Sequence, residues 1–162
     1  MEEISSIFLD GRSACQEAAK TLILGAIREV YLISQRLEAE LYNDAEIHKH
    51  LTQLATSNRA VDIRIIAHNT RAAANQGHYL IHLTQKLPSF AKIRTTVTPA
   101  HKNFRESWLL VDEGAFMRIR NPDRYEGYYT LDNKLECRSF RDEFIDIWEA
   151  CEPDQNTRRL SL

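Results

Sequence analysis

The sequence has few cysteines, no marked excess of charge of either sign and no long apolar run. Its three cysteines, Cys15, Cys137 and Cys151, are odd in number, lie far apart and form no Cys-x-x-Cys pair. Two of them, Cys15 and Cys151, fall on apolar helix faces, where a reduced cysteine behaves as a small hydrophobic residue. The cysteine usage therefore argues for a reducing compartment.

A formal net charge of -2 gives no overall basic field that would favour nucleic acid or an anionic membrane. No apolar stretch approaches the ~18 residues of a membrane span. The acidic start, Met1-Glu2-Glu3, differs from the basic start of a signal peptide. We therefore expect a cytoplasmic protein with no membrane partner, and the sequence indicates no cofactor.

The length and the balance of residue types are those of one globular domain. Apolar residues make up 43% and charged residues 27% of the 162 positions, which excludes a disordered chain. No internal repeat or low-complexity tract interrupts the chain. We expect one domain over residues 1–151 and a flexible, polar C-terminal tail over residues 152–162.

Helical and strand spacing alternate through the first hundred residues. A buried helical stripe comes first, and it consists of Cys15, Ala18, Ala19, Leu22, Ile23 and Ala26. Short β-branched runs at 28–34, 61–67 and 92–98 predict three strands. Helices are predicted between them, near 43–55 and 75–87. Strands that alternate with helices imply crossover connections and a largely parallel sheet.

The character of the chain changes after Pro99. Strands are predicted at 106–111, 115–120 and 128–131, and the first two are joined by a tight turn that begins at Asp112. Ser139 is expected to cap a last helix. The inward face of that helix is predicted to carry Phe140, Phe144, Ile147, Trp148 and Cys151.

Three strand–helix units, a hairpin whose first strand ends at Asp112, and a closing helix with a Phe…Trp face resemble one half of the phospholipase D superfamily. The resemblance implies an α/β phospholipase D-like sandwich: a mixed, mostly parallel sheet with helices on both faces. It also implies pairing of two halves, so we expect a homodimer. Similar sequences occur as bacterial domains of unknown role.

Members of that superfamily carry His-x-Lys-x-x-x-x-Asp on the strand after the third strand–helix unit. Residues two apart on a strand share a face, so the His and the Lys meet one phosphate. The His attacks phosphorus and the Lys neutralises its oxygens. In this chain Arg105 stands at the His position, Ser107 at the Lys position, and Asp112 matches the Asp. Because a guanidinium stays protonated and a serine supplies no cation, the resemblance implies a non-catalytic relative.

An arginine beside a hydroxyl can still bind an anion, since its guanidinium offers two parallel hydrogen bonds to phosphate or carboxylate. The alternative is that Arg105 forms a structural ion pair with Asp112, Glu106 or another carboxylate. His101 could line the same anion-binding site as Arg105. The segment Asn69-Thr70-Arg71 follows a strand at its carboxyl end, where such sheets bind ligands. The candidate anion-binding residues are Arg105, Ser107, Asp112, His101 and Arg71.

Several other functions stay open. One is an active phosphodiesterase or nuclease in which His101 or His78 replaces the lost nucleophile. Another is a metal-dependent nuclease built on Asp112 and Glu113, although no Glu-x-Lys follows on the next strand.

Two further patterns could indicate a metal site or a surface for nucleic acid. His78 and His82 have the spacing of metal ligands but no indicated third ligand, so no metal is expected. Arginines at 118 and 120 precede tyrosines at 125, 128 and 129, a mixture that can bind single-stranded nucleic acid or can protect a hairpin edge by charge.

Overall fold

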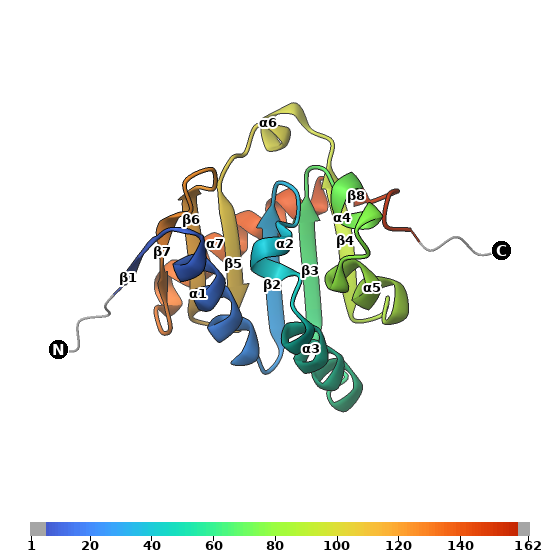
Figure 1. Cartoon of the computed structure of the whole chain (residues 1–162), viewed down its shortest axis with the longest axis horizontal. Coiled ribbons are helices and arrows are strands. Elements are labelled where there is room, and N and C mark those ends of the chain that lie inside the picture. The colour runs from blue at the N-terminus through green and yellow to red at the C-terminus, as the bar shows by residue number, and fades with distance from the viewer. Residues whose placement is uncertain (1–5, 159–162) are drawn as a thin grey trace.

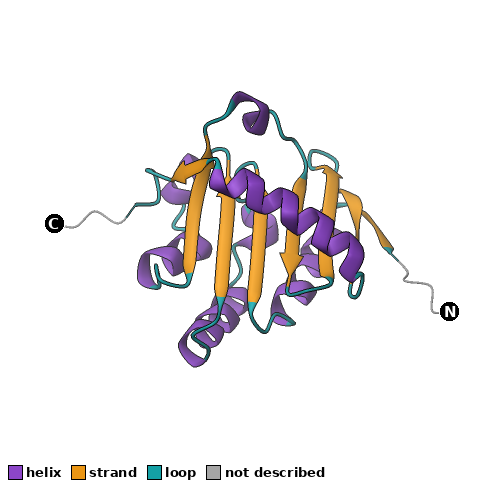
Figure 2. Cartoon of the chain, turned by 180° about the vertical axis from the view of Figure 1, so that it is seen from behind, coloured by secondary structure: helices purple, strands orange, loops and turns teal. Residues whose placement is uncertain are grey.

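A computed structural model describes residues 6–158 as one eight-stranded sheet with helices on both faces (Figures 1 and 2). Its strand order is β1-β7-β6-β5-β2-β3-β4-β8. The strands are β1 Ile7–Asp10, β2 Glu29–Ser34, β3 Asp62–Ala67, β4 Ala91–Thr96, β5 Ser107–Val111, β6 Ala115–Asn121, β7 Glu126–Thr130 and β8 Cys151–Pro153. The helices are α1 Arg12–Leu24, α2 Ala39–Tyr42, α3 Ala45–Ser57, α4 Arg71–Asn75, α5 Tyr79–Lys86, α6 Pro99–Lys102 and α7 Lys134–Glu149.

The sheet is mixed, and most of its pairings are antiparallel. Within residues 6–158, β3 pairs in parallel with β2 and β4, whereas the other five neighbouring pairs are antiparallel. The prediction of a mostly parallel sheet is therefore wrong, and the prediction of a mixed α/β architecture is confirmed. Parallel strands need a long crossover, which α3 and the α4–α5 segment supply. The strands β5, β6 and β7 follow one another through short turns that permit antiparallel pairing alone.

Each face of the sheet has its own hydrophobic core. The first five helices cover one face, and α7 crosses the other (Figures 1 and 2). Every residue of β2 is buried, and its side chains alternate between the two cores. On the α7 face, Tyr31 stacks on Phe144 with ring centroids 4.9 Å apart, and Phe144 in turn stacks on Trp148. Four members of the predicted inward face, Phe140, Phe144, Ile147 and Trp148, are confirmed on α7, whereas Cys151 lies beyond the helix as the first residue of β8.

Helix boundaries differ from prediction in two places. The helix expected over 75–87 begins later, as α5 at Tyr79, because Gly77 adopts a φ of +67° and the His78 side chain caps α5. The last helix begins at Lys134, five residues before the expected cap Ser139. Asn133 is its cap, since its side-chain oxygen accepts the backbone N–H of Glu136.

The segment predicted as a flexible tail begins with β8, which pairs with β4 at one edge of the sheet. Beyond it, Asp154 and Thr157 are buried, and the hydroxyl of Thr70 donates to Asp154 at 2.7 Å. Residues 151–157 therefore pack against the domain. The last four residues, 159–162, lie outside the described part of the chain, and the mobility of the segment in solution stays a prediction.

The antiparallel pairing of β2 with β5 fixes where the motif positions lie. Ile33, near the end of β2, is opposite Trp108, and Val30 is opposite Val111. The start of β5 therefore lies beside the carboxyl ends of β2, β3 and β4. We call this edge the motif end; it is the upper edge in Figure 1, where α6 arches over the sheet. The other edge, where β2 begins and β5 ends, is called the opposite end.

Candidate functional site

Ser107, at the position of the superfamily's lysine, is the first residue of β5 and is 1% exposed. Its hydroxyl donates to the backbone carbonyl of Ile33 at 3.1 Å. It faces the core that contains Tyr42, whose complete burial holds the pKa of its phenol well above the usual range. The hydroxyl is used inside the fold, so Ser107 does not present a polar group to a ligand at the motif end.

Arg105, at the position of the nucleophilic histidine, precedes β5 and has an exposed side chain. Its backbone carbonyl accepts a hydrogen bond from Gln35 at 3.2 Å. Its guanidinium has no carboxylate within 4 Å in the described part of the chain. Glu106 pairs instead with Arg118, through contacts of 2.6 and 3.0 Å. Arg105 therefore pairs with neither Asp112 nor Glu106, and its side chain is exposed.

Asp112 lies at the opposite end, separated from Arg105 by the whole length of β5. Its carboxylate accepts three backbone N–H groups at the start of β2, from Ile27 at 3.1 Å, Arg28 at 3.0 Å and Glu29 at 2.9 Å. Its own N–H donates to the Glu29 carbonyl, and its φ of +53° lies in the left-handed region. Asp112 thus joins the end of β5 to the start of β2 and does not share a site with Arg105.

The remaining candidates lie at the motif end. His101 is a half-buried residue of α6, and its Nδ1 is buried without a hydrogen-bond partner among residues 6–158. Arg71 begins α4 and is exposed, and Asn69 accepts its backbone N–H at 3.0 Å. The hydroxyl of Thr70 is occupied by Asp154. The structure therefore brings Arg105, His101 and Arg71 to one edge of the sheet, the first two on the β4–β5 connection and Arg71 on the connection after β3.

The sequence analysis missed His68, which follows β3 directly at the motif end. Its Nδ1 contacts the Thr96 hydroxyl at 2.7 Å, and its Nε2 is buried and unpartnered within the described residues. Burial lowers the pKa of its imidazole; the nearby Phe104 backbone raises it, and the charge of Arg105 lowers it further. His68 is therefore neutral at pH 7. Its place immediately after a strand is the signal that could have found it.

The histidine pair on α5 has a structural role at its first member. His78 is 1% exposed, and its Nδ1 accepts the backbone N–H of Leu80 at 3.1 Å. Burial lowers the pKa of its imidazole to about 4. A buried cap cannot reach a phosphorus atom, so His78 is unsuited to the role of nucleophile. No group of three or more metal-ligating side chains is close enough to hold a metal ion in residues 6–158.

Three arginines of the sheet, Arg118, Arg94 and Arg64, make contacts within the fold. Arg118 pairs with Glu106, and its strand β6 lies between β5 and β7, so it does not protect an edge. Arg94 lies 4.4 Å from the ring centroid of Trp148 and donates to its carbonyl at 3.0 Å. Arg64 stacks over the rings of Tyr31 and Trp148. Arg120 is exposed and has no ion pair within residues 6–158, so the basic character of this face rests mainly on one arginine.

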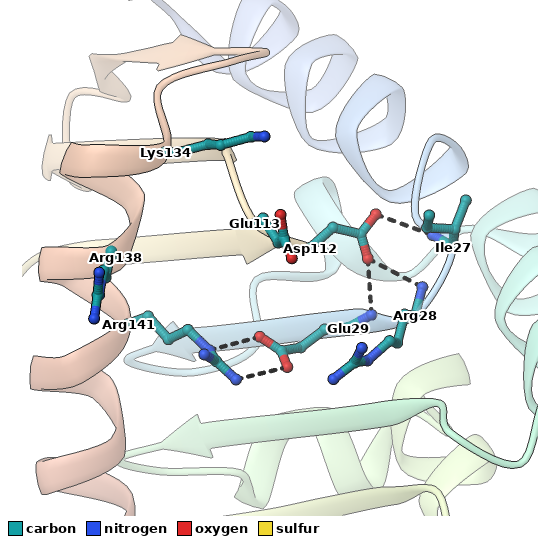
Figure 3. Close-up of a pocket in the computed structure, with 8 residues that line it drawn as sticks. All are labelled: Ile27, Arg28, Glu29, Asp112, Glu113, Lys134, Arg138 and Arg141. Atoms are coloured by element: carbon teal, nitrogen blue, oxygen red, sulfur yellow. Dashed lines mark hydrogen bonds and ion pairs between the residues drawn. The ribbon is translucent and has the colours of Figure 1, made fainter.

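A cavity of about 610 Å³ opens at the opposite end, between the start of β2, the end of β5 and α7 (Figure 3). Its lining consists of Ile27, Arg28, Glu29, Asp112, Glu113, Lys134, Arg138 and Arg141. Arg141 forms a double contact with the Glu29 carboxylate, at 2.8 and 2.9 Å. The three α7 cations follow i, i+4, i+7 spacing, which places them on one helix face. That spacing was available in the sequence, but nothing local showed which strand the face would meet.

The fold is that of the phospholipase D superfamily. Nuc from Salmonella typhimurium, a phospholipase D family member, is similar with a TM-score of 0.62 and 14% identity, over 93% of this chain and 99% of its own. NucT from Helicobacter pylori gives a TM-score of 0.63 and 13% identity, over 94% and 100% of the two chains.

The archaeal chromatin protein TrmBL2, whose structure shows a mode of DNA binding, gives a TM-score of 0.67 and 14% identity. That similarity covers 95% of this chain but 56% of TrmBL2. No curated protein sequence matches the chain. A family model described as "Domain of unknown function (DUF7931)" matches residues 11–160.

Proposed function

The chain belongs to the DUF7931 family and has a phospholipase D-like fold, and from this premise we propose that it is a non-catalytic domain that binds a phosphate-containing anion at the motif end. The proposal rests on the environment of the residues at the two motif positions, Arg105 and Ser107. The Ser107 hydroxyl is bonded inside the fold to Ile33, and Arg105 faces solvent. The site has lost the nucleophile and the phosphate-neutralising cation, and it keeps a different cation.

Chemistry of the superfamily type needs a side-chain nitrogen with a free electron pair at the nucleophile position. A guanidinium is protonated at any physiological pH and has no such pair. The serine two residues on carries no charge to stabilise the oxygens of a pentacoordinate phosphorus. Neither step is therefore available at these positions, which supports a binding role.

Binding of an anion is supported by the free charge of Arg105, which lacks an ion pair in the described residues. Arg71 adds a second exposed cation at the same end of the sheet. TrmBL2 has a similar fold and binds DNA, and phosphate is the charged group of DNA. A phosphate group is therefore the ligand chemistry that we assign to the motif end.

The test is the melting temperature of wild type and Arg105→Gln with and without inorganic phosphate, with Lys49→Gln as a matched control. Lys49 is an exposed cation on α3; it is not one of the motif-end residues and does not line the cavity at the opposite end. At ten times Kd, a ligand stabilises by about 1.4 kcal/mol, which for this size raises Tm by roughly 3–5 °C. We expect this rise in wild type and Lys49→Gln and its loss in Arg105→Gln. Phosphate that leaves wild-type Tm unchanged would overturn the binding proposal.

An active phosphodiesterase that uses non-motif residues is a second candidate, and one observation favours it. Two imidazole nitrogens at the motif end, Nε2 of His68 and Nδ1 of His101, have no hydrogen-bond partner in residues 6–158. Both atoms are buried, however, and a nucleophile must reach phosphorus to within van der Waals contact. The burial of these atoms is why we prefer the binding role.

We also propose that two copies of the chain form a homodimer. The resemblance to one half of a two-lobed superfamily motivates this, and the structure adds an uncovered edge. Strand β1 pairs on one side alone within residues 6–158, and on it Ile7 is 45% and Phe8 is 74% exposed. Unpaired edges of this kind favour association.

None of the described helices is long and apolar enough to cross a membrane.

A further inference from the structure

We propose that the cavity at the opposite end, which we call the α7 cavity, is a second anion-binding site that takes a compact polyanion with two or more phosphate groups, of the class of inorganic pyrophosphate. It is built from residues other than those of the motif end, so it goes beyond the function proposed above. The argument rests on unpaired charge, on a rigid floor and on the lining chemistry.

The first observation is the excess of unpaired cations. Four basic and three acidic side chains line the α7 cavity. Glu29 is neutralised by its double contact with Arg141. The other three cations, Arg28, Lys134 and Arg138, have no carboxylate within 4 Å in the part of the chain that the structure describes. Cations from β2 and from α7 thus line one hollow with unused hydrogen-bond donors.

The second observation is that the floor of the cavity is held in place before any ligand arrives. Asp112 accepts three backbone N–H groups and fixes the start of β2 against the end of β5. Arg141 links α7 to β2 through Glu29 (Figure 3). Its guanidinium also lies 5.8 Å from the ring centroid of Tyr31. Because strand and helix are joined in this way, little backbone ordering remains to oppose binding.

The chemistry of the lining selects the ligand class. Ile27 is the single apolar side chain among the lining residues, and no aromatic ring lines the cavity. A nucleobase would therefore find no aromatic ring to stack against. A volume near 610 Å³ exceeds what one phosphate needs, and cations that project from two different elements suit an anion with more than one charged group. A diphosphate meets both conditions.

The α7 cavity is distinct from the motif end. Asp112 and Glu106, the two residues that flank β5, are six steps apart along the strand, which at about 3.3 Å per residue is roughly 20 Å. One small anion cannot bridge that distance. Binding at each end can therefore be removed independently.

The experiment is calorimetric titration of the full chain with sodium pyrophosphate at low salt. The test variant is Lys134→Gln with Arg138→Gln, and both side chains are exposed. The control is Lys49→Gln with Arg124→Gln, which removes the same formal charge from exposed positions outside the α7 cavity. Wild type and control should bind with closely similar Kd. Loss of two charge-assisted contacts should raise Kd in the test variant by at least tenfold.

Every other outcome decides against the inference. Absence of pyrophosphate binding in wild type overturns it, and so does an equal loss in the control, which would show a nonspecific charge effect. Arg105→Gln is titrated in parallel: loss of binding there, with binding retained in the α7 variant, would place pyrophosphate at the motif end. That result would support the proposed function and reject the α7 cavity as a site. A circular dichroism spectrum identical to wild type confirms that each variant is folded.

Discussion

Substitution of Asp112 tests whether this residue is a structural latch between β5 and β2. Its carboxylate accepts three backbone N–H groups at 2.9–3.1 Å. The N–H groups of Ile27 and Arg28 are in exposed surroundings and can bond to water after the substitution, so each lost bond costs about 1 kcal/mol. The bond from Glu29 is partly buried and ends on a charged acceptor, so its loss costs about 2 kcal/mol.

The sum for removal of the carboxylate is therefore about 4 kcal/mol. The backbone at Asp112 has a φ of +53°, which a glycine adopts freely and an alanine does not. Asp112→Gly should therefore lose about 4 kcal/mol, and Asp112→Ala about 1 kcal/mol more. Asp112→Asn keeps one acceptor oxygen and tolerates this φ, so we expect a loss of about 2 kcal/mol.

Urea unfolding followed by circular dichroism measures these free energies, with the slope m held constant across the series. A loss of 4 kcal/mol corresponds to a fall in Tm of roughly 8–16 °C for a chain of this size. If Asp112→Gly stays within 1 kcal/mol of wild type, the three hydrogen bonds do not contribute as we describe. If alanine and glycine reverse their order, the left-handed backbone is not the cause of the difference.

Two further predictions follow from buried groups and exposed edges. The folded pKa of His78, about 4, lies below its usual value of 6.5, so the unfolded chain binds the proton first as pH falls. Stability should therefore be complete above pH 6.5 and decline by up to about 3 kcal/mol towards pH 4. His78→Gln should flatten that part of the Tm–pH curve, and an unchanged slope would contradict the burial argument. The proposed homodimer predicts twice the monomer mass in light scattering at tens of micromolar, and a monomer mass there would reject it.

Local patterns in the sequence predicted much of the fold. The stripe on α1 that contains Cys15 and Leu22 is buried as expected, because helical periodicity depends on near neighbours alone. The Asp112 turn also lies where predicted. The later start of the helix expected over 75–87 was missed because its apolar stripe, Leu80, Leu83 and Leu87, does not mark where the helix begins, whereas the φ of +67° at Gly77 does.

Strand direction could not be predicted in the same way. Pairing joins segments that are distant in sequence, such as Leu9 with Gly127 and Thr96 with Cys151, and no local pattern encodes which edges meet. For the same reason the sequence did not show that β2 and α7 bring their cations to one cavity. The motif spacing did place Ser107 on the strand beside β2, but burial of its hydroxyl depends on the carbonyl of Ile33 across the sheet.

The central claim, that this phospholipase D-like domain is not a phosphodiesterase, is tested most directly by hydrolysis of bis-p-nitrophenyl phosphate. Wild type should release p-nitrophenol no faster than buffer, because Arg105 has no free electron pair and the Ser107 hydroxyl is bonded inside the fold. His68→Ala and His101→Ala are measured beside it, since they carry the unpartnered imidazole nitrogens. All three proteins should be indistinguishable from buffer. Turnover that persists through purification of wild type and disappears in either histidine variant would contradict the account.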